Sequence, residues 1–274
     1  MKRCFSTLGC WDRSLADILS LATQYGIDAV ELRGIGGILD NREIPALSET
    51  HREPTLEALK KNGISISVLG TSCSFHRADR WDAALAEGLE SIRIAERLHI
   101  PAIRVFGDRL LPDDKNGCME RVINGLRQLC RASDGVHILL EVHGDFNTVE
   151  SLTPVINEMK EIPNFGLIWD IEHTHRPYGS DWPVFYRFAR PYVKHVHVKD
   201  RSDAENRLTM IGEGDVPILP IVKTLLKDGY DGCFSLEWEK KWHPELSDIE
   251  EALEAFLALT RDIHHLTTSK EKQK

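Results

Sequence analysis

Three acids and one histidine are spaced as ligands of a single metal ion would be. Glu141, Asp170, His197 and Glu237 each follow or end a short apolar run, and successive positions are 29, 27 and 40 residues apart. Each interval is long enough for one strand, one helix and two loops. Carboxylates and an imidazole suit a divalent ion such as Mn²⁺, Mg²⁺, Co²⁺ or Zn²⁺. The alternative is that each acid caps its own strand or pairs with a nearby arginine or lysine. The joint placement of all four favours the metal site.

The elements that must position these residues are predicted from hydrophobic periodicity. Eight apolar segments recur along the chain, and most are continuous runs typical of strands covered on both faces. Segments with 3.6-residue periodicity separate them, and Gly26, Gly63 and Gly229 stand where helices are expected to end. The predicted strands are residues 3–7, 28–33, 65–70, 102–107, 138–143, 165–170, 193–198 and 233–238.

Alternating strands and helices define the expected fold class. Eight strand–helix units in this chain average about 34 residues each, which suits a (β/α)₈ barrel. A doubly wound open sheet would usually offer a glycine-rich loop after its first strand, and the sequence has none there. We therefore predict an α/β protein whose single domain, residues 1–266, is a TIM barrel. Residues 267–274 are predicted to be a polar, frayed tail.

The composition indicates a soluble, acidic protein. The mean hydropathy is −0.29 and the formal net charge is −9, so nucleic acid and anionic membranes are poor partners. No apolar run approaches the roughly 18 residues needed to cross a bilayer. The six cysteines form no C-x-x-C pair, as expected of reduced, mostly buried thiols. We predict a cytoplasmic protein without nucleic-acid or membrane partners, whose exposed barrel helices are compatible with a homo-oligomer.

Four short motifs carry a family resemblance. The segments 139–143 (LLEVH), 169–173 (WDIEH), 195–200 (HVHVKD) and 235–238 (SLEW) resemble the sugar-phosphate isomerase/epimerase superfamily of xylose isomerase-like TIM barrels. The glycine-containing segments at 212–214 and 229–232 also stand where this superfamily has them, so the resemblance covers nearly the whole chain. The motifs are specific for the superfamily but not for a substrate.

The resemblance implies roles for particular residues. One divalent metal ion would be bound by Glu141, Asp170, His197 and Glu237. Glu141 and Glu237 would also be the acid/base pair that flanks the substrate. The residues expected to contact the substrate are His173, Arg104, Lys199 and His143. His143 follows Glu141 by two positions and shares its side of an extended strand, although a solvent-facing loop histidine is the alternative.

These groups predict an isomerase or epimerase of a keto-sugar or sugar phosphate that transfers a proton through an enediolate. Loss of a β-hydroxyl from the same intermediate would instead give a dehydratase of 3-dehydroshikimate or keto-inositol type. An apurinic endonuclease IV-like nuclease is a weaker alternative, because that family needs further histidines near the ends of the early strands and His76 is the only nearby candidate.

Four neighbouring residues receive separate predictions. Glu31 ends the second strand and is expected to pair with Arg33 or Arg104. His195 alternates with His197 and is expected to be a hydrogen-bonded core residue one layer deeper. Glu172 and His175 are expected on the loop surface.

Overall fold

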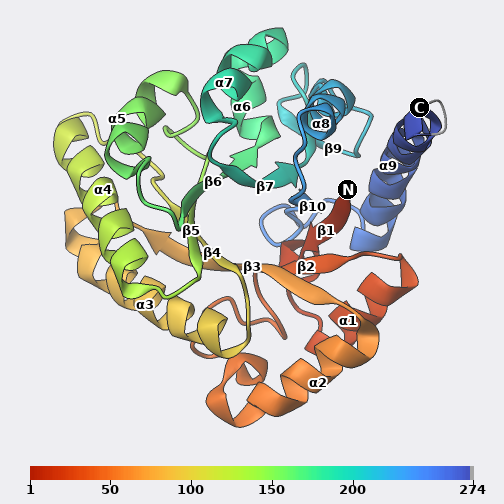
Figure 1. Ribbon diagram of the computed structural model, residues 1–274, viewed down its shortest axis with the longest axis horizontal. Helices are drawn as coiled ribbons and strands as arrows, with labels where there is room; N and C mark the ends of the chain where they lie inside the picture. Colours follow the sequence, from red (N-terminus) through yellow and green to blue (C-terminus); the bar gives the residue numbers. More distant parts are fainter. Residues whose placement is uncertain (272–274) are drawn as a thin grey trace.

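In the computed structural model, which describes the backbone of residues 1–271 and the side chains of residues 1–261, eight parallel strands close into a barrel. Neighbouring strands follow the order β1-β10-β7-β6-β5-β4-β3-β2. The predicted single-domain TIM barrel is therefore confirmed (Figure 1). The barrel strands are β1 (Lys2–Ser6), β2 (Ala29–Leu32), β3 (Ser65–Ser74), β4 (Ala102–Phe106), β5 (His137–Glu141), β6 (Phe165–Asp170), β7 (Val193–Val198) and β10 (Cys233–Leu236).

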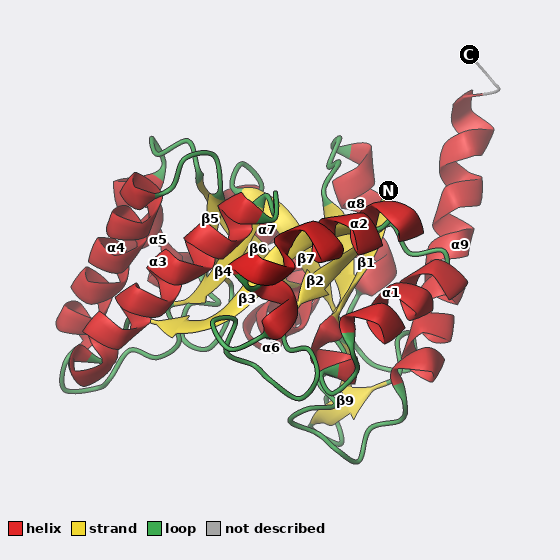
Figure 2. Ribbon diagram, turned by 90° about the horizontal axis from the view of Figure 1, so that it is seen from below, coloured by secondary structure: helices red, strands yellow, loops and turns green. Residues whose placement is uncertain are grey.

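Helices surround the barrel, and a small hairpin projects from one end of it (Figure 2). The hairpin pairs β8 (Asp200–Ser202) with β9 (Arg207–Thr209) in antiparallel fashion. None of the described helices is long and apolar enough to cross a membrane. The α-helices are α1 (Leu15–Gln24), α2 (Arg52–Asn62), α3 (Trp81–Arg97), α4 (Lys115–Ala132), α5 (Val149–Met159), α6 (Ile171–Tyr178), α7 (Trp182–Ala189), α8 (Ile218–Lys227) and α9 (Ile249–Glu271). The 3₁₀ helices are η1 (Thr7–Cys10), η2 (Pro45–Leu47), η3 (Glu49–His51), η4 (Ala78–Arg80) and η5 (Gly179–Asp181).

The helix ends follow local chemistry. Helix α5 begins with a capping box, in which the Thr148 side chain accepts from the Ser151 amide and the Ser151 hydroxyl accepts in return. Gly26, Gly63 and Gly229 have φ values of 60°, 65° and 84°, so the predicted glycine endings are confirmed. Helix α9 continues to Glu271, and residues 272–274 of the predicted tail lie outside the described residues.

One strand is longer than its apolar run. The predicted segment 65–70 is part of β3 (Ser65–Ser74), whose pairing with β4 is irregular between Gly70 and Ser74. The Thr71 hydroxyl donates to the Arg104 carbonyl at 2.6 Å across this irregularity. Polar side chains therefore continue the strand where hydrophobicity no longer indicates one.

The barrel interior changes from apolar to ionisable along its axis. Val68, Ala102, Leu139 and Ile168 form a small cluster separate from the large core between strands and helices. Two residues further along three of these strands stand Arg104, Glu141 and Asp170, all buried. Because side chains alternate along a strand, these residues share the inward face at the C-terminal end of the barrel.

Candidate metal centre

The four predicted ligands converge on one point. Glu141, Asp170, His197 and Glu237 each offer an oxygen or nitrogen atom, and the four atoms lie within 4.8 Å of one another. All four side chains are buried, with residue exposures between 0% and 3%. Ligands of a common ion about 2.0–2.2 Å away lie within about 4.4 Å of each other. The cluster therefore needs only a small contraction to bind one ion.

The strand ends hold these side chains in place. Glu141 is the last residue of β5, and Asp170 is the last residue of β6. The Asp170 carboxylate also caps α6, since Oδ1 accepts from the amides of Glu172 at 2.9 Å and His173 at 3.1 Å. The Glu237 amide donates to the Val198 carbonyl at 3.0 Å, just beyond β10. Each ligand is thus attached to backbone that the barrel ladder fixes.

The His197 ring is oriented by Glu31. Nε2 of His197 lies 2.9 Å from Oε2 of Glu31, which also accepts from His195 and Ser235. Nδ1 of His197 then faces Glu141 Oε1 at 3.5 Å and Glu237 Oε2 at 3.3 Å. A carboxylate behind a metal-binding imidazole fixes its tautomer and direction.

The predictions for Glu31 and His195 have different outcomes. The predicted pairing of Glu31 with Arg33 or Arg104 is wrong, because its carboxylate is used by His195, His197 and Ser235. The prediction for His195 is confirmed, since it is 2% exposed and bonded to Glu31. Histidines two positions apart share one inward face of β7, and this geometry favours them over arginines as partners of Glu31.

Two cations belonging to the chain lie among the carboxylates. Nη1 of Arg104 is 3.1 Å from Glu141 Oε2 and 3.6 Å from Glu237 Oε1. Nζ of Lys199 is 2.8 Å from Asp170 Oδ2 and 2.7 Å from Glu237 Oε2. Both side chains are almost wholly buried. Arg104 and Lys199 therefore contact the ligand set itself.

Among the described residues, three ligand atoms make no well-aligned hydrogen bond, although charged groups lie close to each of them. These are Oε2 of Glu141, Oδ2 of Asp170 and Nδ1 of His197. Buried polar atoms without partners cost free energy unless something else satisfies them. A divalent ion between these atoms would meet that need, and three carboxylates with one imidazole are a suitable donor set. The residues present therefore fit one divalent ion.

The pKa shifts reflect crowded buried charges. Burial raises the pKa of Asp170 to about 8, although Lys199 acts in the opposite direction. Burial also opposes ionisation of the two glutamates, but Arg104 lowers the pKa of Glu141, and His197 with Lys199 lowers that of Glu237. Both glutamates are therefore ionised, as a proton-accepting pair requires.

Two histidines form one wall beside the cluster. The His143 and His173 rings pack at a tilt of 55° with centroids 4.2 Å apart, and the Phe106 ring packs edge-on against His143 at 5.1 Å. A cavity of about 350 Å³ opens beside both rings, and its lining includes Arg176 and Arg201. Burial holds the pKa of His173 well below its ordinary value, so this ring is a neutral hydrogen-bonding group.

Three residues differ from the expectations or were missed. Glu172 and His175, predicted on the surface, are buried in α6 at 0% and 8% exposure, and Glu172 pairs with Arg176 and Arg201. Asp200 was not singled out. Its carboxylate accepts from the amides of Arg201, Gly212, Gly214 and Val216, which anchors the loop that follows β9. The aspartate of the His-x-Lys-Asp segment and the nearby Gly-x-Gly were the available signals.

The nuclease alternative would need a further metal-binding histidine near the early strand ends, and His76 is not placed with the described metal ligands. Its Nδ1 lies 2.9 Å from the Ser74 hydroxyl and 3.7 Å from Asp108. His76 belongs to neither group of potential metal ligands found among the described side chains.

Known proteins share this architecture. The family model of the xylose isomerase-like TIM barrel matches residues 19–259. The putative L-ribulose-5-phosphate 3-epimerase SgbU of Escherichia coli (strain K12) is 27% identical over 267 residues, covering 89% of this chain and 93% of the relative. Two solved structures, each 19% identical, share the fold. They are the probable 3-DHS dehydratase AsbF from Bacillus anthracis (TM-score 0.77, covering 95% and 99% of the two chains) and the IOLI protein solved with a zinc atom (TM-score 0.76, covering 96% and 98%). The chain therefore belongs to the xylose isomerase-like TIM barrel family.

Proposed function

We propose that this protein is a divalent-metal-dependent isomerase or epimerase of a keto-sugar or sugar phosphate. The observation that carries the proposal is the pair Glu141 and Glu237. They come from β5 and β10, which β6 and β7 separate in the barrel, and Nη1 of Arg104 lies between them. A substrate bound over the cluster would have one carboxylate on each side of its reacting carbon.

Glu141, Asp170, His197 and Glu237 would hold the ion. When bound, it would supply positive charge that stabilises the enediolate oxygens and orients the carbonyl and adjacent hydroxyl. Arg104 and Lys199 keep the carboxylates in place, and Arg104 has further donors for substrate oxygens. Lys199 would bind a substrate oxygen by exchanging one of its three carboxylate contacts, to Asp170, Glu237 and Glu239. His173 and His143 offer ring nitrogens to the remaining hydroxyls.

Proton transfer then follows from the two glutamates. One carboxylate removes the proton from the carbon next to the carbonyl, and the electron pair moves into the enediolate. Return of a proton to the neighbouring carbon gives isomerisation. Delivery of a proton by the other glutamate to the opposite face gives epimerisation, and this glutamate must first take up that proton from solvent. An epimerisation leaves the protonation states of Glu141 and Glu237 exchanged, and solvent resets them. Arg104 contacts both and stabilises whichever is ionised.

The relative's name supports a phosphorylated pentulose as the first substrate to try. Metal-loaded protein in D₂O, incubated with L-ribulose 5-phosphate and a panel of free and phosphorylated ketoses, is expected to place deuterium next to the carbonyl. Proton NMR would detect the exchange. Glu141→Gln and Glu237→Gln should each reduce the rate about 10²–10⁴-fold. Glu43→Gln, at an exposed position, is the matched control. Folded, metal-loaded protein that exchanges no proton across the panel would refute the proposal.

A second candidate is a dehydratase acting through the same enediolate. The observation that favours it is the position of His143, whose ring packs against that of His173, because loss of a β-hydroxyl needs an acid beside the leaving oxygen. Similarity in fold to a probable dehydratase is compatible with this reaction. Incubation with 3-dehydroshikimate or a keto-inositol would give an ultraviolet-absorbing product, and His143→Gln would slow its formation.

A further inference from the structure

A second cavity lies at the N-terminal mouth of the barrel, at the opposite end from the metal cluster. It measures about 470 Å³, and Cys233 and His195 line it. The exposed side chains of Lys2, Lys194 and His99 also line it. Neither aspartate nor glutamate is among the described residues that line this cavity. The positive charge around this cavity therefore favours an anionic ligand.

Cys233 is arranged there as an activated thiol. It stands beside His195 in the β10–β7 ladder, so the two side chains leave neighbouring strands on the same inward face of the barrel. Nε2 of His195 lies 3.0 Å from Oε2 of Glu31, so Nδ1 is the ring nitrogen that this contact does not use. The neighbouring Cys4, and then His195, lower the pKa of Cys233 below that of an ordinary thiol. Low-pKa thiols in cationic, partly accessible surroundings are the reactive ones.

Cys4 supports this thiolate without being placed to form a disulfide with it. Cys4 and Cys233 share a small buried cluster with Ala29. The ladder pairs Cys4 with Ser235, whereas Cys233 pairs with Lys2, so the cysteines are two positions out of register. Such a diagonal separates Cα atoms by about 8 Å in a flat sheet, beyond the roughly 7 Å limit for a disulfide. An adduct on Cys233 should therefore persist.

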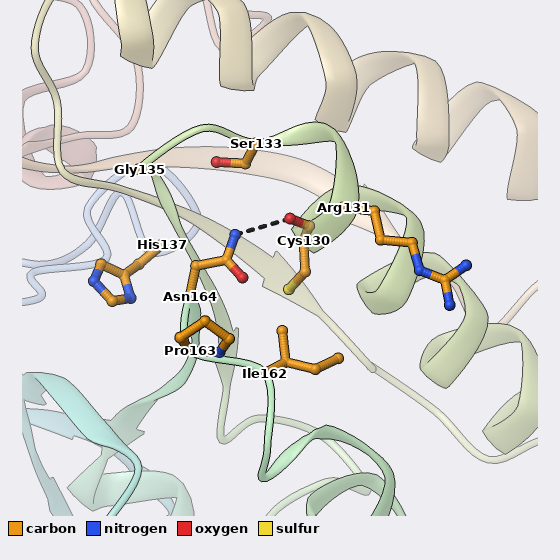
Figure 3. A pocket seen from close by; sticks show the side chains of 8 residues that line it. All are labelled: Cys130, Arg131, Ser133, Gly135, His137, Ile162, Pro163 and Asn164. Carbon is orange, nitrogen blue, oxygen red and sulfur yellow. Dashed lines mark hydrogen bonds between the residues drawn. The ribbon is translucent and has the colours of Figure 1, made fainter.

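Cys130 provides an internal comparison. It lines the neighbouring N-terminal cavity of about 670 Å³, where the Asn164 amide donates to the Cys130 carbonyl at 2.9 Å (Figure 3). Cys130 and Cys233 are 5% and 8% exposed, so they are similarly accessible. Burial raises the pKa of Cys130 to about 12. The two cysteines thus differ in the pKa of the thiol rather than in solvent exposure.

We propose that Cys233 is a thiol-modification site that forms a mixed disulfide with an anionic low-molecular-weight disulfide entering the N-terminal cavity. The Cys233 thiolate attacks one sulfur of the small disulfide, a bond forms between them, and the other half leaves as a thiolate. The protein thiol is oxidised and the departing half is reduced, so the reaction needs no further oxidant. Lys2 and Lys194 would form ion pairs with the carboxylates of the small disulfide.

The test uses the full-length protein at pH 6.5, with glutathione disulfide as the anionic probe and cystamine as the cationic one. Intact mass and peptide mapping should find one adduct per chain, on Cys233 and not on Cys130. At low salt the anionic probe should react at least tenfold faster than the cationic probe. Lys194→Gln should reduce the rate for glutathione disulfide several-fold, and Cys130→Ser should leave it unchanged.

Three results would overturn the proposal. The first is the absence of an adduct on native protein whose six cysteines all react after denaturation. The second is an adduct that maps to another cysteine. The third is an equal reaction rate with the two probes. Mapping on the unmodified sequence needs no variant, so poor folding of Cys233→Ser would not affect the outcome. None of these readouts depends on sugar turnover, so the result is separate from that of the proposed function.

Discussion

Nε2 of His197 lies 2.9 Å from Oε2 of Glu31, and this contact turns Nδ1 of the same ring toward Glu141 and Glu237. The Glu31 carboxylate lies wholly inside the barrel and accepts from His195 and Ser235 as well. A single acid on β2 thus connects β7 and β10 beneath the candidate metal centre. The direction of the imidazole is therefore set before any ion binds.

Replacing Glu31 with Gln should weaken metal binding while leaving the fold intact. Loss of a carboxylate behind a metal-binding histidine typically costs 10–100-fold in affinity. Isothermal titration with Mn²⁺ or Zn²⁺ would measure the change, and circular dichroism would monitor folding. The control variant Glu43→Gln should bind the metal with the affinity of the unaltered protein. Equal affinities for Glu31→Gln and the unaltered protein would show that the contact does not orient the ligand.

Metal affinity should increase with pH. The Asp170 pKa is raised to about 8 and the His197 pKa is well above its ordinary value, so both carry protons at pH 6–7 without metal. An ion must displace these protons, so affinity rises as pH increases toward 8. Displacement of one to two protons raises the metal affinity about 10- to 100-fold per pH unit. Titrations in buffers of different ionisation enthalpy would count the protons. A metal affinity that stays unchanged between pH 6 and pH 8 would contradict the assignment.

Lys199→Met should destabilise the metal-free protein. The lysine ammonium contacts Asp170 at 2.8 Å and Glu237 at 2.7 Å, and its removal leaves buried carboxylates with less positive charge nearby. Breaking such a pair costs about 3–5 kcal/mol. Urea denaturation would measure this loss, and saturating Mn²⁺ should recover part of it. Lys227→Met, at an exposed position, is the matched control. Stability equal to that of the control would contradict this role for Lys199.

Asp200→Ala should loosen the loop after β9 without removing the metal. The carboxylate accepts from four backbone amides, and each buried donor left unpaired costs about 1–3 kcal/mol. We expect a measurable loss of stability in urea, whereas the exposed control Asp231→Ala should lose little. Metal content should stay the same. Loss of the ion from a stable Asp200→Ala protein would mean that Asp200 is a ligand.

The fold and the cluster could both be predicted because each depends on a repeated local signal. Continuous apolar runs mark strands covered by helices, and ligands at the run ends must meet when such strands close into a barrel. Glu141, Asp170, His197 and Glu237 therefore converge as predicted, and the structure places their side chains within one buried cluster. Their chemical roles stay predictions.

The remaining contacts depend on which elements the barrel brings together. Glu31 meets His195 and His197 because β2 and β7 face each other across the interior, 164 and 166 residues apart in the chain. Glu172 is buried because Arg201, 29 residues later, reaches it from β8. Hydrophobic periodicity contains no information about such polar pairs, so charged residues near strand ends were assigned to the surface or to the wrong partner.

Elemental analysis of purified, untagged protein tests the central claim most directly. Protein incubated with Mn²⁺, Co²⁺ or Zn²⁺ and then freed of loosely bound ions should hold about one divalent ion per chain, and Glu237→Ala should hold none while keeping its fold. An unaltered protein that retains no ion, or a Glu237→Ala protein that retains it fully, would contradict the metal centre and the proton-transfer mechanism built on it.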